Sequence, residues 1–404
     1  MSNRSIFKEQ LSRRELGKIA LGGALGATAL SGLSQSSSVQ EKTSSAAAPK
    51  TKWPRKGLQA QAPTWPLKGL HLSINAPANP TDEDFLLFQQ LAIDCVYVRG
   101  MAPEEQTVEG LINLRNRYAD AGIYVDDVDN SSVTANLDDI VLNTPGRDKA
   151  IEGYKSWLRT LGKAGLHQME SVMYGATGSV TSGEYEIRGG IKQRAFDINS
   201  NQITGSPWHV SGRGTINSLL FGREYSREEI WANYTYFMKQ IVPVAEEAGV
   251  RFGLLGDSPA LPGPNPTIFG IARILSNPQD CEKALKIANS PMAGMNGLFG
   301  EDYFKYQPIL AAHGAGGGGN GDRRPDSPEA KLQVRGGWMD EGDINAKIEH
   351  MKLLAKYVPN GSHTLGGALA MVGGRRTYQA YAVAYTRAQM QVAGLGPGYT
   401  VILD

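Results

Sequence analysis

Residues 221–263 read FGREYSREEIWANYTYFMKQIVPVAEEAGVRFGLLGDSPALPG, and this stretch holds the clearest structural pattern in the chain. Ser226 is followed three residues later by Glu229, the spacing of a capping box at a helix N-terminus. Apolar and aromatic side chains then recur at helical spacing, and Gly249 is placed to end the helix in the left-handed conformation. The pattern predicts a helix over 227–248.

The run that follows this helix, 251–255, is short and nearly uncharged, which is typical of a strand buried on both faces. Gly256 and Asp257 then begin a polar turn, so Asp257 stands at the carboxyl end of the predicted strand. Active sites of parallel α/β barrels lie at this edge of the strands. The stretch therefore predicts one βα unit of a barrel with a candidate site residue.

The same alternation of short apolar runs and helical runs extends along the chain. It predicts strands at 67–74, 95–98, 123–128, 168–174, 251–255, 294–299, 308–313 and 364–371. It predicts helices at 82–92, 108–121, 147–164, 227–248, 280–287, 344–357 and 378–392. Eight strands alternating with helices favour an α/β fold of the (β/α)8 TIM-barrel type over an open doubly wound sheet. No Gly-x-Gly-x-x-Gly turn follows the first strand, which disfavours dinucleotide binding.

Composition sets limits on the partners. The 404 residues are 41% hydrophobic and 20% charged, and the formal net charge is +1, so we expect neither nucleic acid nor an anionic membrane as partner. The expected partner is a small carbohydrate or sugar acid, and a homo-oligomer is left open. Cys95 and Cys281 are predicted to be buried thiols, with a disulfide between them as the alternative.

The N-terminus has the pattern of an export signal. Residues 12–18, SRRELGK, resemble the twin-arginine motif, and an uncharged run follows to residue 33. That run is shorter than the about 20 apolar residues needed to span a bilayer, so we expect a cleaved signal over 1–34 without stable membrane insertion. The twin-arginine export machinery is then a partner, and the mature chain is periplasmic or extracellular. The alternative is a basic amphipathic helix of a cytosolic protein.

Residues 35–64 are Ser, Ala, Gln, Lys and Pro with little apolar content, which predicts a flexible linker before a barrel domain over 65–404. Two polar insertions, 175–220 and 314–337, follow the fourth and seventh predicted strands. Loops this long in a compact barrel are typical of lids, and we expect them to cover its mouth.

Several phrases of the chain resemble the mannonate dehydratase family. They are PGRDKAIEGYKSWLRTLGKAG (145–165), RGGIKQRAFD (188–197), GREYSREEIW, IVPVAEEAGV, FGIARILSNPQDCEKALKIANSP (269–291) and DEGDIN (340–345). The resemblance implies a xylose-isomerase-like TIM barrel and a lyase that removes water from a sugar acid to yield a 2-keto-3-deoxy acid. It also implies a bound Mn²⁺ or Mg²⁺.

Two of the residues at the family's metal-site motifs are matched, and they are His313 and Asp257. At the other ligand positions of the family, this chain has Leu255, residues 298–300 (LFG) and residues 365–367 (LGG). The predicted metal-binding residues are therefore His313 and Asp257 alone.

The chemistry needs a proton acceptor and a proton donor around the leaving water, and cations for the carboxylate. The candidate catalytic residues are His313, Asp257, Tyr174 and His209, and the candidate substrate-binding residues are Arg188, Lys192 and Trp208. Two alternatives stay open. The first is an exported isomerase, epimerase or metal-free lyase on the same barrel, and the second is a carbohydrate-binding protein without catalytic activity.

Overall fold

The computed structural model describes residues 62–129, 133, 137–178, 180–187, 191–205, 213–257, 261, 264–296, 312–313, 332–334, 361–365 and 374–396. All of them belong to one compact unit, Thr51–Asp404. The predicted export signal, most of the predicted linker and the predicted helix 344–357 lie outside the described residues.

Eight strands run parallel to their neighbours and follow the predicted order. They are β1 (Leu70–Pro77), β2 (Cys95–Arg99), β3 (Tyr124–Val128), β4 (Gln168–Met173), β7 (Arg251–Leu255), β10 (Ala293–Asn296), β11 (Ala312–His313) and β13 (Gly361–Leu365). Five pair in the order β11-β13-β1-β2-β3, and three in the order β10-β7-β4. Within each group, neighbouring strands follow one another along the chain. The exception is β13, the last of the eight, which pairs with β1, the first. The predicted barrel is confirmed, and the open sheet is wrong.

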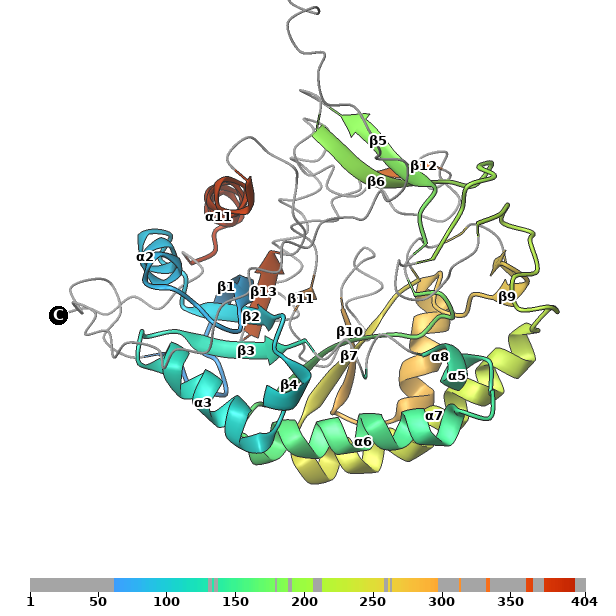
Figure 1. The fold of residues 1–404 in the computed structure, drawn as a ribbon, viewed down its shortest axis with the longest axis horizontal. Helices are drawn as coiled ribbons and strands as arrows, with labels where there is room; N and C mark the ends of the chain where they lie inside the picture. The colour runs from blue at the N-terminus through green and yellow to red at the C-terminus, as the bar shows by residue number, and fades with distance from the viewer. Residues whose placement is uncertain are drawn as a thin grey trace, which may run out of the picture. The chain divides into compact units, whose positions relative to one another are not determined.

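Helices lie outside these strands (Figure 1). They are α2 (Asp82–Gln90), α3 (Val108–Ala119), α5 (Asp138–Val141), α6 (Arg147–Lys163), α7 (Arg227–Ala248), α8 (Pro278–Ala288) and α11 (Gly374–Val392), with a short 3₁₀ turn, η1 (Pro103–Glu105). Predicted starts at 82, 108, 147 and 227 agree with the observed ones. No helix among the described residues is long and apolar enough to cross a membrane.

The local signals around α7 act as predicted. The Ser226 hydroxyl accepts a hydrogen bond from the Glu229 amide at 3.2 Å, and Gly249 ends the helix with φ of 64°. The Glu229 carboxylate is bound by both terminal nitrogens of Arg223, at 2.6 and 2.9 Å. The central residues of β7 are buried as predicted, and β4 and β10 pair with its two edges.

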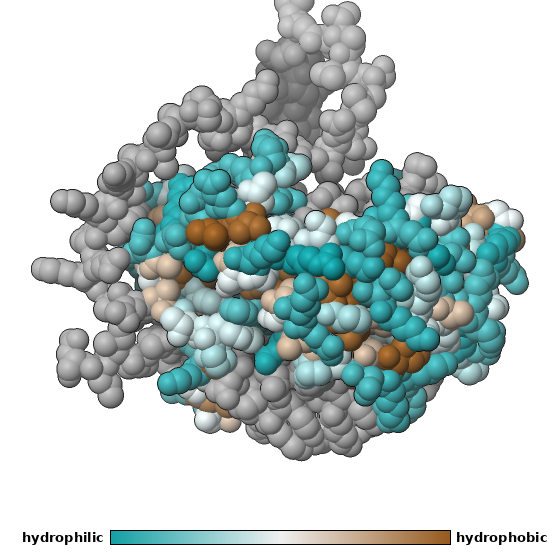
Figure 2. Space-filling view, turned by 90° about the horizontal axis from the view of Figure 1, so that it is seen from below, coloured by the Kyte–Doolittle hydropathy of each residue, from teal (hydrophilic) through white to brown (hydrophobic). Residues whose placement is uncertain are grey.

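The contact between α6, α7 and β4 is rich in aromatic side chains. Tyr154 of α6 meets Phe237 of α7 edge to face, with ring centres 5.3 Å apart. Gly162 of α6 passes so close to α7 that an added Cβ would lie 2.4 Å from the Ala248 carbonyl oxygen. From the side on which α6 and α7 lie, the surface is mostly hydrophilic and its hydrophobic residues form separated patches (Figure 2).

The two predicted insertions meet in one small antiparallel sheet. From the first insertion come β5 (Gly183–Ile187) and β6 (Ile191–Asp197), and from the second comes β12 (Leu332–Val334). They pair in the order β12-β6-β5, with Leu332 opposite Asp197, and lie apart from the barrel strands in Figure 1. A separate two-stranded ribbon, β8 (Thr267–Ile268) and β9 (Ile271–Ala272), follows β7. Cys95 and Cys281 are buried and form no disulfide, so the predicted thiols are confirmed and the disulfide is wrong.

Two glycines in this region should respond to alanine with opposite signs. Gly249 has φ of 64° and Gly153 is inside α6, and nothing would touch an added Cβ at either position. Gly249→Ala should lower the free energy of unfolding by about 1–2 kcal/mol because the left-handed conformation disfavours a Cβ. Gly153→Ala should raise it by roughly 0.5–1 kcal/mol. Urea unfolding measures both free energies of unfolding. Equal shifts of the same sign in the two variants would contradict the left-handed C-cap assigned to Gly249.

Candidate functional site

The predicted site residues are distributed unequally over the described structure. His313 ends β11 and is paired with Thr364 of β13, but only its backbone is described. Lys192 is in β6 opposite Glu186, again as backbone alone. Arg188, Trp208 and His209 lie outside the described residues. The side chains of Asp257 and Tyr174 are described, and both follow the carboxyl end of a barrel strand.

Asp257 holds the chain segment that precedes α8. Its carboxylate accepts hydrogen bonds from the Leu275 amide at 2.9 Å and from the Ser276 hydroxyl at 2.8 Å. The other carboxylate oxygen lies 3.7 Å from a terminal nitrogen of Arg273. Burial raises the pKa of the Asp257 carboxyl, and Arg273 and the two hydrogen bonds oppose the rise. With both oxygens engaged, the carboxylate serves as an anchor and does not fit the predicted role of metal ligand.

Arg273 is the charged residue of this region that the sequence analysis missed. Its side chain is 2% exposed, and its guanidinium contacts Asp257 and the Thr177 hydroxyl, the latter at 3.4 Å. The Thr177 amide in turn donates to Asp138 at 2.8 Å, so residues following β4 and β7 are joined. Burial lowers the pKa of Arg273, while the nearby carboxylates of Asp257 and Asp138 raise it. One signal was available, since Arg273 is the lone charge in the apolar run 268–275.

Gly175 makes room for this guanidinium. A Cβ built at Gly175 would lie 2.2 Å from a terminal nitrogen of Arg273. The Nε of Arg273 is buried without a hydrogen-bond partner among the described residues. The ion pair of Arg273 and Asp257 is therefore enclosed, and its geometry depends on the absence of a side chain at residue 175.

Tyr174 belongs to the aromatic core between β4 and α7. Its ring meets Tyr234 edge to face at 4.9 Å and stacks on Phe237 at 6.0 Å. Burial raises the pKa of the Tyr174 hydroxyl well above its usual value, and the hydroxyl has no partner among the described residues. This placement favours a packing role for Tyr174 over the predicted catalytic role.

Charged residues at the ends of β2 and β3 form a better-placed group. Arg99 is the exposed last residue of β2, with its guanidinium 4.7 Å from the centre of the Tyr97 ring. Asp127 is buried near the end of β3, and one of its oxygens accepts from the Val128 amide at 2.6 Å. Burial and the charge of Asp126 raise the pKa of Asp127 well above its usual value. A neutral carboxyl can donate a proton, and a guanidinium can bind a carboxylate.

Few described side chains at the carboxyl-terminal edge of the strands could bind the metal that the family resemblance implies. Among the described side chains, the one group of three metal-binding residues is His71, Asp94 and Cys95. His71 is near the start of β1, and Cys95 begins β2, so this group lies at the amino-terminal end of the strands. The described donors at the carboxyl-terminal edge thus do not fit a Mn²⁺ or Mg²⁺ site.

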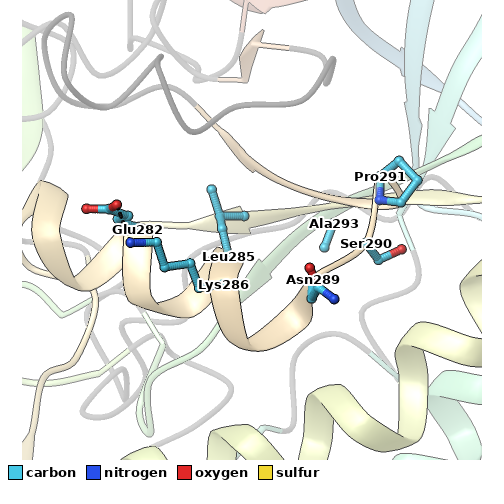
Figure 3. A pocket seen from close by; sticks show the side chains of 7 residues that line it. All are labelled: Glu282, Leu285, Lys286, Asn289, Ser290, Pro291 and Ala293. Atoms are coloured by element: carbon cyan, nitrogen blue, oxygen red, sulfur yellow. Dashed lines mark ion pairs between the residues drawn. The ribbon is translucent and has the colours of Figure 1, made fainter.

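An open hollow of about 380 Å³ lies elsewhere (Figure 3). Its lining comes from the end of α8 and from the segment before β10, and includes an ion pair between Lys286 and Glu282 at 2.5 Å. Ala293, which also lines it, begins β10, so the hollow is at the amino-terminal end of that strand. Neither the position of this hollow nor the residues that line it indicate an active site there.

The anchoring role of Asp257 leads to a stability prediction. Asp257→Asn removes the charge that faces the buried Arg273, which should lower the free energy of unfolding by about 3–5 kcal/mol. Glu152→Gln breaks an exposed ion pair with Lys155 and serves as the control, with an expected loss below about 1 kcal/mol. Urea unfolding compares the two. A stable Asp257→Asn variant that had lost only turnover would instead indicate a catalytic carboxylate.

Comparison with known proteins agrees with this fold. Residues 102–302 match the family model described as D-mannonate dehydratase (UxuA). The chain is 27% identical over 244 residues to mannonate dehydratase 2 of Halalkalibacterium halodurans, covering 56% of this chain and 66% of that protein. It is 26% identical over 200 residues to the mannonate dehydratase of Streptococcus equi subsp. zooepidemicus, covering 46% and 53%. The chain thus spans between about half and two thirds of these relatives.

A solved structure extends the likeness in fold. The crystal structure of mannonate dehydratase from Streptococcus suis serotype 2 has a TM-score of 0.62 with this chain at 20% sequence identity. The superposition covers 83% of this chain and 99% of that one. Residues 102–302 are thus similar in sequence to D-mannonate dehydratases, and the barrel is similar in fold to a solved one.

Proposed function

We propose that this chain is a hydro-lyase that removes water from a sugar acid, converting a mannonate-like aldonate to a 2-keto-3-deoxy acid. The observation that carries the proposal is the family match over residues 102–302, within a barrel shared with a mannonate dehydratase. The substrate class is taken from what the relatives are named for.

The reaction places three demands on the barrel mouth. A base takes the proton from the carbon next to the carboxylate, and an acid protonates the hydroxyl that leaves from the following carbon as water. The resulting enol then becomes the 2-keto acid. A fixed positive charge must hold the substrate carboxylate throughout, and an arginine does this best because its two parallel N–H groups match a carboxylate.

Residues at the carboxyl-terminal edge supply these groups. Arg99 is the described cation that suits the carboxylate, and Asp127, whose pKa is raised by burial and by the charge of Asp126, is the acid. His313, the last residue of β11, is the base. The insertion that follows β4 contains Arg188, Lys192, Trp208 and His209. We assign Arg188, Lys192 and Trp208 to substrate binding and keep His209 as a candidate catalytic residue.

The resemblance implies Mn²⁺ or Mg²⁺, which would stabilise the negative charge that develops on the substrate. In a metal-dependent reaction, His313 would bind the ion instead of acting as the base, since the Asp257 carboxylate is engaged elsewhere. The residues at the family's other ligand positions, Leu255, 298–300 (LFG) and 365–367 (LGG), favour one second candidate, a metal-independent lyase or isomerase of sugars on the same barrel. Metal dependence separates the two.

Turnover of mannonate, with and without added Mn²⁺, tests the function. We expect formation of the 2-keto-3-deoxy acid, and a kcat at least about 100-fold lower for His313→Ala because a general base is lost. His167→Gln is the control, since His167 lies just before β4, at the opposite end of the barrel, where it stacks on Trp65. Unchanged kcat in His313→Ala would remove His313 from the site. No turnover with any aldonate would leave the binding-protein alternative.

Export is also part of the proposal. The paired arginines Arg13 and Arg14 precede an uncharged run, and folded proteins leave the cytoplasm by a route that reads such a pair. Changing both to Lys keeps the charge and should retain the chain in the cytoplasm of a bacterial host, while the unchanged chain appears in the periplasm. Equal periplasmic amounts in cell fractions would contradict the signal.

A further inference from the structure

Three buried side chains meet at the amino-terminal end of β1 and β2. The Nδ1 of His71 lies 3.0 Å from each carboxylate oxygen of Asp94. Cys95 follows Asp94 directly, and one ligand atom from each of the three residues lies within 4.8 Å of the others. All three are at most 3% exposed. The proposed reaction uses none of them.

The second ring nitrogen of His71 is already oriented as in a metal site. Its Nε2 donates to the Lys68 carbonyl oxygen at 3.1 Å. A histidine that binds metal through one nitrogen commonly donates its other N–H to a carbonyl, which fixes the ring and its tautomer. In His71, that bond leaves Nδ1, which faces Asp94 and Cys95, as the nitrogen able to bind a cation.

We propose that His71 Nδ1, the Asp94 carboxylate and Cys95 Sγ form a structural binding site for a zinc-class divalent cation. Nitrogen, oxygen and sulfur donors together suit Zn²⁺, whereas Mg²⁺ prefers oxygen alone. Bond lengths of about 2.0–2.3 Å put neighbouring tetrahedral ligands roughly 3.3–3.8 Å apart. Since the three ligand atoms already lie within 4.8 Å of one another, shifts of about 1 Å suffice.

The exchange also keeps the charge of this buried site constant. Both nitrogens of His71 face oxygen acceptors. Without metal, an imidazolium paired with the Asp94 carboxylate and a thiol at Cys95 would give the site no net charge. Binding of Zn²⁺ releases one proton from Nδ1 and one from the thiol. The cation is then balanced by one carboxylate and one thiolate, and no net charge is added where charge is costly.

The surroundings make this an enclosed site. Cys95 packs against Leu67 and Tyr124, and Trp65 covers this cluster. Trp65 is itself held between the His167 ring at 5.5 Å and the Arg251 guanidinium at 4.8 Å. Asp126 interacts electrostatically with both His71 and Cys95, and its carboxylate accepts a hydrogen bond from the Gln168 side chain. Because of this cover, the cation should enter during folding and exchange slowly.

Cobalt tests the site by its spectrum. The full chain is unfolded and refolded with Co²⁺ under reducing conditions, and we expect a near-ultraviolet band from thiolate bound to cobalt, lost when Zn²⁺ is added during refolding. The chain has two cysteines, so Cys281→Ser is the matched control and should keep the band. Cys95→Ser should abolish it, and Asp94→Asn should weaken Co²⁺ binding at least tenfold.

Two results would overturn the site. One is the absence of a thiolate band in the refolded, native-like chain at saturating Co²⁺, and the other is a band that persists in Cys95→Ser. Circular dichroism confirms folding of each variant. The cobalt result does not depend on the proposed dehydratase function, because the residues assigned to the dehydratase site include no cysteine. Failure of the dehydratase proposal would appear in the turnover assay alone.

Discussion

The buried ion pair of Asp257 and Arg273 is the interaction on which the carboxyl-terminal edge of the barrel depends. Asp257 follows β7, holds the chain before α8 through Leu275 and Ser276, and faces a guanidinium that reaches Thr177 beyond β4. Charges this deeply buried are costly unless each has its partner, so the pair enforces one arrangement of three loops. Gly175 is part of the same constraint because any side chain there would displace the guanidinium.

The two ends of the barrel have different chemistry. At the carboxyl-terminal edge are Arg99 and Asp127, to which the proposed function assigns binding and protonation of a sugar acid. The strands β5 and β6 of the insertion sheet come from the segment that follows β4. At the amino-terminal edge, His71, Asp94 and Cys95 are buried, and Trp65 packs against the cluster that contains Cys95. Barrel enzymes in general react at the first edge and derive stability from the second, and the two proposals follow that division.

At Asp257, the family resemblance and the geometry of the site indicate different roles. Its position matches a family motif, yet its hydrogen bonds make it an anchor for residues 273–276. A carboxylate next to a metal site is as useful for holding a loop as for binding the ion, and sequence alone does not distinguish the two uses. The same holds for Tyr174, whose place after β4 suggested catalysis and whose ring packs on Tyr234 and Phe237.

The amino-acid sequence by itself determined the elements. Helical spacing, the caps at Ser226 and Gly249, and short apolar runs are local properties, and they yielded the eight strands, their order and the start of α7. Only the tertiary structure decided which side chains meet. The pairing of β6 with β12, the bond from Asp257 to Ser276 and the approach of His71 to Asp94 join residues 135, 19 and 23 positions apart at their closest. Such contacts depend on how the parallel strands close around the barrel, and no local pattern encodes that geometry.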